Sequence, residues 1–151
     1  MDLRNDDGCY ERRFEMRTFV LAYDESPEAG RALEKTAELA KLLDAKVIVT
    51  SVAPVMHLAG RGIGPYDPAD PPERHRELAR DATAILTERG IDAKAVTGLG
   101  EPGDAIVDLA DKQGADLIVL GMSHHPHLSR ILGGVSEDVA HRAHCDVLLV
   151  H

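Results

Sequence analysis

The stretch "ADLIVLGMSHHPHLSRILGGVSED" (residues 115–138) joins a run of aliphatic side chains to a glycine, a histidine cluster and a glycine pair. A continuous aliphatic run bounded by glycine is typical of a strand buried on both faces. Glycine lets the main chain turn sharply and approach a phosphate, and amides at a helix start attract anions. The stretch predicts a buried strand that opens into a phosphate-binding loop, or else a strand that ends in an ordinary turn.

Strands and helices alternate on either side of this stretch. We expect strands at 17–23, 46–52, 91–98, 115–121 and 146–150, and helices at about 26–43, 72–89, 101–114 and 129–143. Glycines and prolines in residues 53–71 predict a long loop without regular structure. The spacing in the second helix predicts that it turns inward the side chains of Leu78, Ala82, Ile85 and Leu86.

This alternation requires a parallel sheet covered on both faces. The prediction is therefore α/β: a single doubly wound domain whose five-stranded parallel sheet has the order 3-2-1-4-5, with helices on both faces. Ligands of such sheets bind beyond the carboxyl ends of the strands, where the strand order reverses. That point lies between the first and fourth strands, which end near Asp24 and Gly121.

Composition limits the classes of partner. The 17 Lys and Arg against 26 Asp and Glu give a net charge of −9, which disfavours nucleic acid and acidic membrane surfaces. No apolar run reaches the roughly 20 residues of a membrane helix, and the first residues lack a signal peptide, so we expect a cytoplasmic protein. Cys9 and Cys145 do not suggest a disulfide framework.

The charged residues 1–15 show no apolar period, which predicts a mobile N-terminal tail before a domain at 16–151. Met16 leaves two possible translation starts, Met1 and Met16. With 151 residues, the chain is long enough for one hydrophobic core.

Several side chains suggest chemistry by their type. Asp24 can accept hydrogen bonds from a ribose or help to cap the first helix, a role for which Ser26 competes. His124, His125 and His127 form a cluster that is read as solvated, because three histidines around Pro126 do not converge on one metal ion. The sequence contains neither a nucleophile elbow nor a P-loop, so we do not expect an enzyme.

Three segments resemble the universal stress protein family, and the likeness extends from Arg17 to Val150. They are "FVLAYDESPEAGRALEKTAELAK", "GEPGDAIVDLADKQGADLIVLG" and "LSRILGGVSEDVAHRAHCDVLLV". Nucleotide-binding members carry a glycine after strand four, two residues, a second glycine, nine residues, and then glycine followed by Ser or Thr. This chain departs from that pattern, because His124 replaces the second glycine, only eight residues separate His124 from Gly133, and Gly134 replaces the hydroxyl residue.

The resemblance implies a nucleotide site. Asp24 would face the ribose, the main chain around Val52 would meet the adenine, and the loops at Gly121 and Gly133 would hold phosphates. Gly100 matches a family glycine beside the same crevice. The complete set of expected contacts is Asp24, Val52, Gly100, Gly121, His124, Gly133, Gly134, Val135 and Ser136.

We therefore expect a cytoplasmic stress-response protein that binds ATP or AMP, with Mg²⁺ accompanying the nucleotide, and acts as a non-catalytic regulator. Strand 146–150 is apolar and would lie at a sheet edge, so a homodimer through this strand is expected, as the resemblance also implies. The alternative is a dimeric interaction module that has lost nucleotide binding and uses residues 53–71 as its contact surface. Which nucleotide binds, which stress induces the protein and which protein partner it meets are not predicted.

Overall fold

The computed structural model describes residues 16–57, 63–122 and 134–151. The expected tail at 1–15 and the first part of the expected last helix, 129–133, lie outside these ranges. No helix in the described ranges combines the length and the apolar character that crossing a membrane requires.

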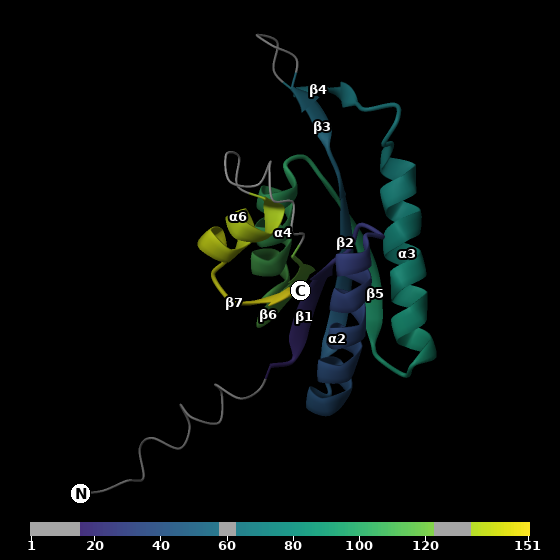
Figure 1. The fold of residues 1–151 in the computed structure, drawn as a ribbon, viewed down its shortest axis with the longest axis vertical. Helices are drawn as coiled ribbons and strands as arrows, with labels where there is room; N and C mark the ends of the chain where they lie inside the picture. Colours follow the sequence, from purple (N-terminus) through teal and green to yellow (C-terminus); the bar gives the residue numbers. More distant parts are fainter. Residues whose placement is uncertain (1–15, 58–62, 123–133) are drawn as a thin grey trace, which may run out of the picture.

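Five parallel strands form one sheet in the order β5-β2-β1-β6-β7 (Figure 1), which confirms the predicted order 3-2-1-4-5. The strands are β1 (Thr18–Ala22), β2 (Lys46–Ala53), β5 (Ala93–Leu99), β6 (Leu117–Gly121) and β7 (Asp146–Val150). Strand order reverses between β1 and β6, because β1 pairs with β2 on one side and with β6 on the other. β7 lies at an edge of the sheet, as predicted.

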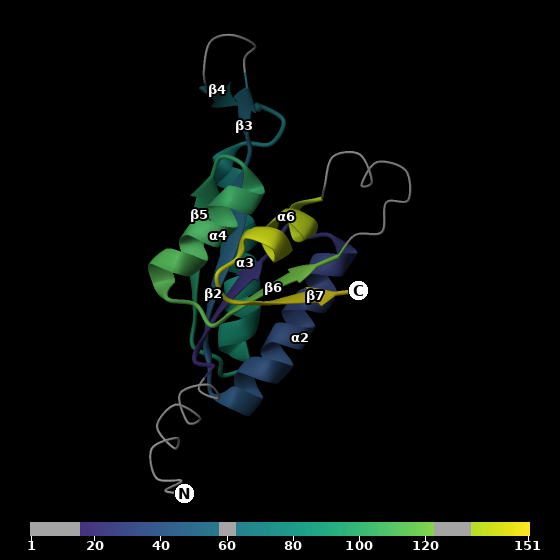
Figure 2. The same cartoon turned by 90° about the vertical axis from the view of Figure 1, so that its left-hand side faces the viewer.

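Helices cover both faces of the sheet, which is plain when Figures 1 and 2 are compared. One face carries α2 (Pro27–Leu43) and α3 (Pro72–Glu88), and the other carries α4 (Pro102–Gln113) and α6 (Val135–Arg142). Successive residues of a strand pack alternately against the two helix layers. Phe19 and Leu21 pack with the α2/α3 layer, whereas Val20 packs with the α4/α6 layer. The prediction of helices on both faces is confirmed.

Helix α2 begins and ends where local chemistry allows. Ser26 is its N-cap and accepts a hydrogen bond at 3.1 Å from the main-chain N of Ala29, and Pro27 occupies the first turn, where a missing N–H costs nothing. The helix ends at Asp44, whose φ of 51° is left-handed. Small side chains such as Ala32 and Ala37 face the sheet, so this helix can pack closely on it.

The prediction that residues 53–71 contain no regular structure was wrong. Ala53 ends β2, and the chain then forms β3 (Val55–His57) and β4 (Ile63–Tyr66), an antiparallel pair that projects beyond the sheet in Figure 1. Pro65 is compatible with β4 because each strand of a two-stranded ribbon has an open edge that needs no N–H.

The predicted inward face of α3 was partly wrong. Ile85 is 37% exposed, whereas Ala82 and Leu86 are fully buried. The buried stripe continues toward the start of the helix through Ala79 and His75. A polar histidine therefore takes an inward position that apolar spacing alone did not reveal.

Candidate functional site

A cavity of about 400 Å³ opens at the carboxyl ends of β1, β2 and β6, where the strand order reverses. This volume lies within the range of small-molecule sites. Five of the predicted contacts line it, namely Asp24, Val52, Gly121, Val135 and Ser136. The end of the first strand and the start of α6 therefore border one cavity, as the sequence argument required.

The other predicted contacts lie nearby or outside the described ranges. Gly134 is the N-cap of α6, directly before the lining residue Val135. Gly100 has a φ of +114°, which favours glycine, and its N–H donates to the carbonyl of Ala53 at 3.1 Å. His124 and Gly133 fall in 123–133, which the structure does not describe.

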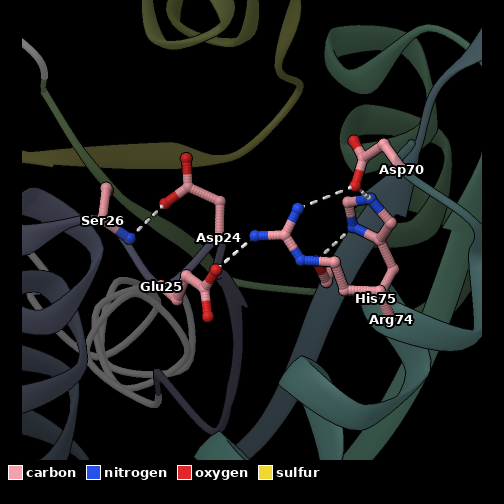
Figure 3. A network of polar contacts seen from close by, with 7 residues as sticks. Asp24, Glu25, Ser26, Asp70, Arg74 and His75 are labelled. Carbon is pink, nitrogen blue, oxygen red and sulfur yellow. Dashed lines mark hydrogen bonds and ion pairs between the residues drawn. The ribbon is translucent and has the colours of Figure 1, made fainter.

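The turn after β1 places carboxylates at the mouth of the cavity. Asp24 Oδ1 accepts a hydrogen bond from the N–H of Ser26 at 3.0 Å, so Asp24 supports the turn in which Ser26 caps α2 (Figure 3). Glu25 has a left-handed φ of 60°, which is uncommon for a residue with a side chain. Its carboxylate pairs with the guanidinium of Arg74, which links this turn to α3.

A chain of polar contacts leads from Arg74 into the protein. Arg74 and His75 both contact Asp70, with His75 Nε2 3.0 Å from Asp70 Oδ1 (Figure 3). His75 Nδ1 lies 2.8 Å from Ser51 Oγ, and both of these residues are buried. An ionised carboxylate only accepts hydrogen bonds, so we assign the ring proton to Nε2 and the Ser51 hydroxyl as donor to Nδ1.

This chain of contacts has the residue types of a hydrolytic triad, but its geometry favours a structural role. Ser51 and His75 also line the cavity, but the ring is reversed relative to the Ser-His-Asp template. Its Nδ1 faces the Ser51 hydroxyl and its Nε2 faces the carboxylate of Asp70, whereas the template places Nε2 on the serine and Nδ1 on the carboxylate. The contacts instead fasten the start of α3 to β2. Sequence reasoning missed them because 24 residues separate the serine from the histidine, and only the helical spacing of His75 with Ala79 hinted that the ring is buried.

Thr50, the neighbour of Ser51 on β2, has the opposite environment. It is 1% exposed and lines the cavity, yet within the described residues its hydroxyl has no hydrogen-bond partner. Ile48 and Val52 lie two residues before and two residues after Thr50 on the strand, and both pack with the α4/α6 layer. Thr50 therefore faces that layer, whereas Ser51 faces α3.

Gly121 has a packing reason to be glycine. A Cβ atom at this position would lie 2.5 Å from the carbonyl carbon of Glu28 in the first turn of α2. The end of β6 and the start of α2 therefore approach too closely for any side chain. This contact explains the residue without a ligand, so its predicted phosphate contact stays a prediction.

The cavity wall is acidic. Asp24, Glu28 and Asp70 line it, and the described lining residues include no Lys or Arg. Tyr23 also lines it, and burial, followed by the charges of Glu25 and then Asp24, raises the pKa of its phenol.

No group of three or more metal-binding side chains converges in the described part of the chain. The cluster of His124, His125 and His127 lies outside that part. His144 follows the end of α6, and its Nδ1 lies 2.9 Å from a carboxylate oxygen of Asp111.

Comparison with known proteins gives consistent matches along the chain. The model of the Universal stress protein family matches residues 15–151. A universal stress protein of Methanocaldococcus jannaschii is 31% identical over 152 residues, covering 98% of this chain and 86% of the relative. Another, from Mycobacterium tuberculosis, is also 31% identical and covers 89% of this chain and 96% of its own length.

Solved structures resemble the fold over almost its full length. A universal stress protein in complex with cAMP has a TM-score of 0.72 and 27% identity, covering 91% of this chain and 98% of that protein. The universal stress protein from Archaeoglobus fulgidus in complex with dAMP has a TM-score of 0.67 and 29% identity, covering 90% and 98% respectively.

Proposed function

The chain belongs to the universal stress protein family, and from that premise we propose that it binds an adenine nucleotide, ATP or AMP, in the crevice at the strand-order reversal. It acts as a non-catalytic regulator in the cytoplasmic stress response. The observation that carries this proposal is that Asp24 and the start of α6 border the same cavity. The universal stress proteins whose structures were solved in complex with cAMP and dAMP support the choice of an adenine nucleotide.

The main chain of β2 supports adenine binding beside Val52. The carbonyl of Ala53 points to the β5 side, where it accepts a hydrogen bond from the N–H of Gly100. The carbonyl of Thr50 points to the β1 side, where it accepts a hydrogen bond from the N–H of Tyr23. By the alternation of a strand, the N–H and C=O of Val52 also point to the β1 side. Because β1 ends at Ala22, these groups lie beyond its last residue and border the cavity. A donor and an acceptor side by side match the edge of adenine that carries N1 and the amino group.

The start of α6 supports phosphate binding. Gly134, Val135 and Ser136 present main-chain amides in the first turn, and Gly134 has no side chain to cap them. Glu137 and Asp138 follow in that turn, and carboxylates also line the cavity. A polyphosphate would therefore enter an acidic environment, which fits a Mg²⁺ ion held by the phosphates and by carboxylates such as Asp24.

The direct test is mass analysis of small molecules released on denaturing freshly purified protein, followed by calorimetric titration with ATP and AMP, each with and without Mg²⁺. We expect a bound or titratable adenine nucleotide and no nucleotide turnover. Absence of both a released adenine compound and heat at millimolar ligand would remove the proposal. It would favour the interaction module, for which the projecting β3–β4 pair with its exposed Tyr66 offers a contact surface.

Two substitutions that restore the family pattern sharpen the test. Gly134→Ser supplies the missing hydroxyl at the N-cap, and one added hydrogen bond to a phosphate should tighten ATP binding roughly tenfold. His124→Gly should tighten binding if the ring obstructs the phosphates and weaken it if the ring donates to them. Gly30→Ser, at a helical position with open space around it, serves as the control that should leave affinity unchanged.

We also propose a homodimer through the open side of β7, whose described pairing is with β6. The carbonyl of Val150 points to the β6 side, where it accepts a hydrogen bond from the N–H of Met122. Because successive residues of a strand point their main-chain groups to opposite sides, those of Leu149 point to the open side. Leu149→Pro removes an outward N–H while keeping the β6 ladder. We expect a dimer by light scattering for the wild type and a monomer for this variant, and a wild-type monomer would refute the proposal.

A further inference from the structure

Among the described residues, the hydroxyl of Thr50 has no hydrogen-bond partner, although Thr50 lines the crevice. We propose that Thr50 is a specificity residue that hydrogen-bonds a heteroatom of the nucleobase in a subsite on the α4/α6 side of the crevice. This inference rests on the proposed function and deepens it, because it says where the base lies and which side chain reads it.

The first argument is the state of the hydroxyl itself. Buried polar groups in proteins nearly always have a partner, and leaving one without a partner is costly. Thr50 is 1% exposed and has no partner within the described ranges, while it lines a cavity large enough for a small molecule. A ligand that enters the cavity with a polar atom would remove this cost.

The second argument is the surroundings of Thr50. Most cavity residues around Thr50 on this side of the sheet are apolar, as expected for a flat ring system, and they include Ala22, Val52, Ile106 and Leu120. Pro102 and Val135 close the same side, where Ser136 at the start of α6 is the other hydroxyl residue of the lining. A hydroxyl among such aliphatic walls suits a base, which has flat apolar faces and a polar rim, better than it suits a phosphate.

The third argument is the position of Thr50 on its strand. Thr50 and Val52 lie two residues apart, about 6.6 Å along β2, and their side chains share one face. A base that meets the main chain of Val52 therefore passes close to the Thr50 side chain. Ser51 points to the other face, and its hydroxyl is already bonded to His75, so it is not available in the same way.

The main test is calorimetric titration of Thr50→Val with AMP. Valine keeps the shape of threonine and removes only the hydroxyl, so we expect affinity to fall roughly five- to tenfold. Stability to urea should stay the same or rise, since no protein group loses a partner. Thr50→Ser keeps the hydroxyl and should retain affinity close to wild type, which covers the case in which valine disturbs folding.

Ser51→Ala is the matched control at the neighbouring position. Its hydroxyl serves His75, so this variant should lose stability while its affinity for AMP changes less than that of Thr50→Val. Equal losses of affinity in the two variants would overturn the assignment of Thr50.

Base analogues identify the contact. Purine riboside monophosphate lacks the amino group, and the 7-deaza and 3-deaza forms of AMP each lack one ring nitrogen. One of the three should bind the wild type more weakly than AMP does, whereas Thr50→Val should bind that analogue and AMP with equal affinity. If none shows this coupling, the hydroxyl does not contact the base and the inference is wrong.

The outcomes separate the two proposals. If the wild type binds no adenine nucleotide, the proposed function fails and this inference falls with it. If the wild type binds AMP and Thr50→Val binds it equally well, nucleotide binding stands and only the inference fails, with a buried water as the partner of Thr50.

Discussion

Thr50 and Ser51 are adjacent on β2, carry the same functional group, are equally buried and both line the crevice, yet their hydroxyls differ in their hydrogen-bond partners. Ser51, on the α2/α3 side of the crevice, contacts His75, which in turn contacts Asp70. Thr50, on the α4/α6 side, has no partner in the described part of the chain and faces aliphatic walls.

This difference separates two uses of a buried polar group. A group whose partners are all in the protein fixes the fold, because removing one member leaves another without a partner. A group that lines a cavity without a partner contributes nothing to the fold and is free to serve a ligand. The α2/α3 side of the crevice should therefore govern stability, and the α4/α6 side should govern ligand choice.

The largest effect on stability should come from His75→Ala. The ring is 7% exposed and holds both Ser51 and Asp70, so its loss leaves a cavity and a buried hydroxyl without its acceptor. We expect the free energy of unfolding to fall by roughly 2–4 kcal/mol. Urea denaturation measures this free energy. A smaller loss for His75→Ala than for Ser51→Ala would contradict the view that the His75 ring holds both Ser51 and Asp70.

Gly121→Ala should follow, because its new Cβ would lie 2.5 Å from the Glu28 carbonyl carbon and force β6 away from α2. We expect a loss of roughly 1–3 kcal/mol. Gly134→Ala is the matched glycine on the other side of the crevice, where the nearest atom is Ser136 Oγ at 3.9 Å and the φ is −65°. Thermal unfolding should show little change for Gly134→Ala, and equal losses in the two variants would refute the packing argument.

Ser51→Ala against Thr50→Val tests the comparison at two neighbouring residues. Ser51→Ala deprives His75 Nδ1 of its donor and should lower the free energy of unfolding by roughly 1–2 kcal/mol. Thr50→Val should be neutral or slightly stabilising, because it removes a polar atom that had no partner. Urea denaturation of the two variants in one buffer measures both changes. A larger loss of unfolding free energy for Thr50→Val than for Ser51→Ala would contradict the view that the α2/α3 side governs stability.

The smallest effect is the pH dependence contributed by Tyr23, which packs with the α2/α3 layer. Burial and the carboxylates of Glu25 and Asp24 raise its pKa in the folded protein above the ordinary value of about 10. Its contribution to stability is therefore complete below pH 10 or so and is lost as the pH rises through the folded pKa.

Ultraviolet absorbance titration of the phenol, with Tyr23→Phe subtracted, measures this pKa. Titration of Tyr23 at or below the pKa of the unfolded chain would contradict the proposed effect of burial.

The architecture could be predicted from the sequence because its signals are local and repeated. Aliphatic runs such as 115–121 and the capped start of α2 at Ser26 specify strands and helices with little help from the rest of the chain. The rules of parallel sheets leave only a handful of strand orders, and the order 3-2-1-4-5 places the crevice between Asp24 and Gly121.

The polar interior could not be predicted in the same way. Ser51 and His75 meet only because β2 and α3 pack together, and nothing near either residue in the sequence signals the contact. Whether Thr50 has a partner depends on every side chain that approaches it. The β3–β4 pair was missed because glycines and prolines mark irregular chain more often than a short ribbon.

The alternation of β2 also bears on how such a protein can change over generations. Substitutions at position 50 alter what the crevice accepts, whereas those at position 51 put the packing of α3 at risk. A lineage can therefore drift in ligand preference through one residue while purifying selection acts on the next. Descendants with the same architecture and different small molecules are the expected result of that arrangement.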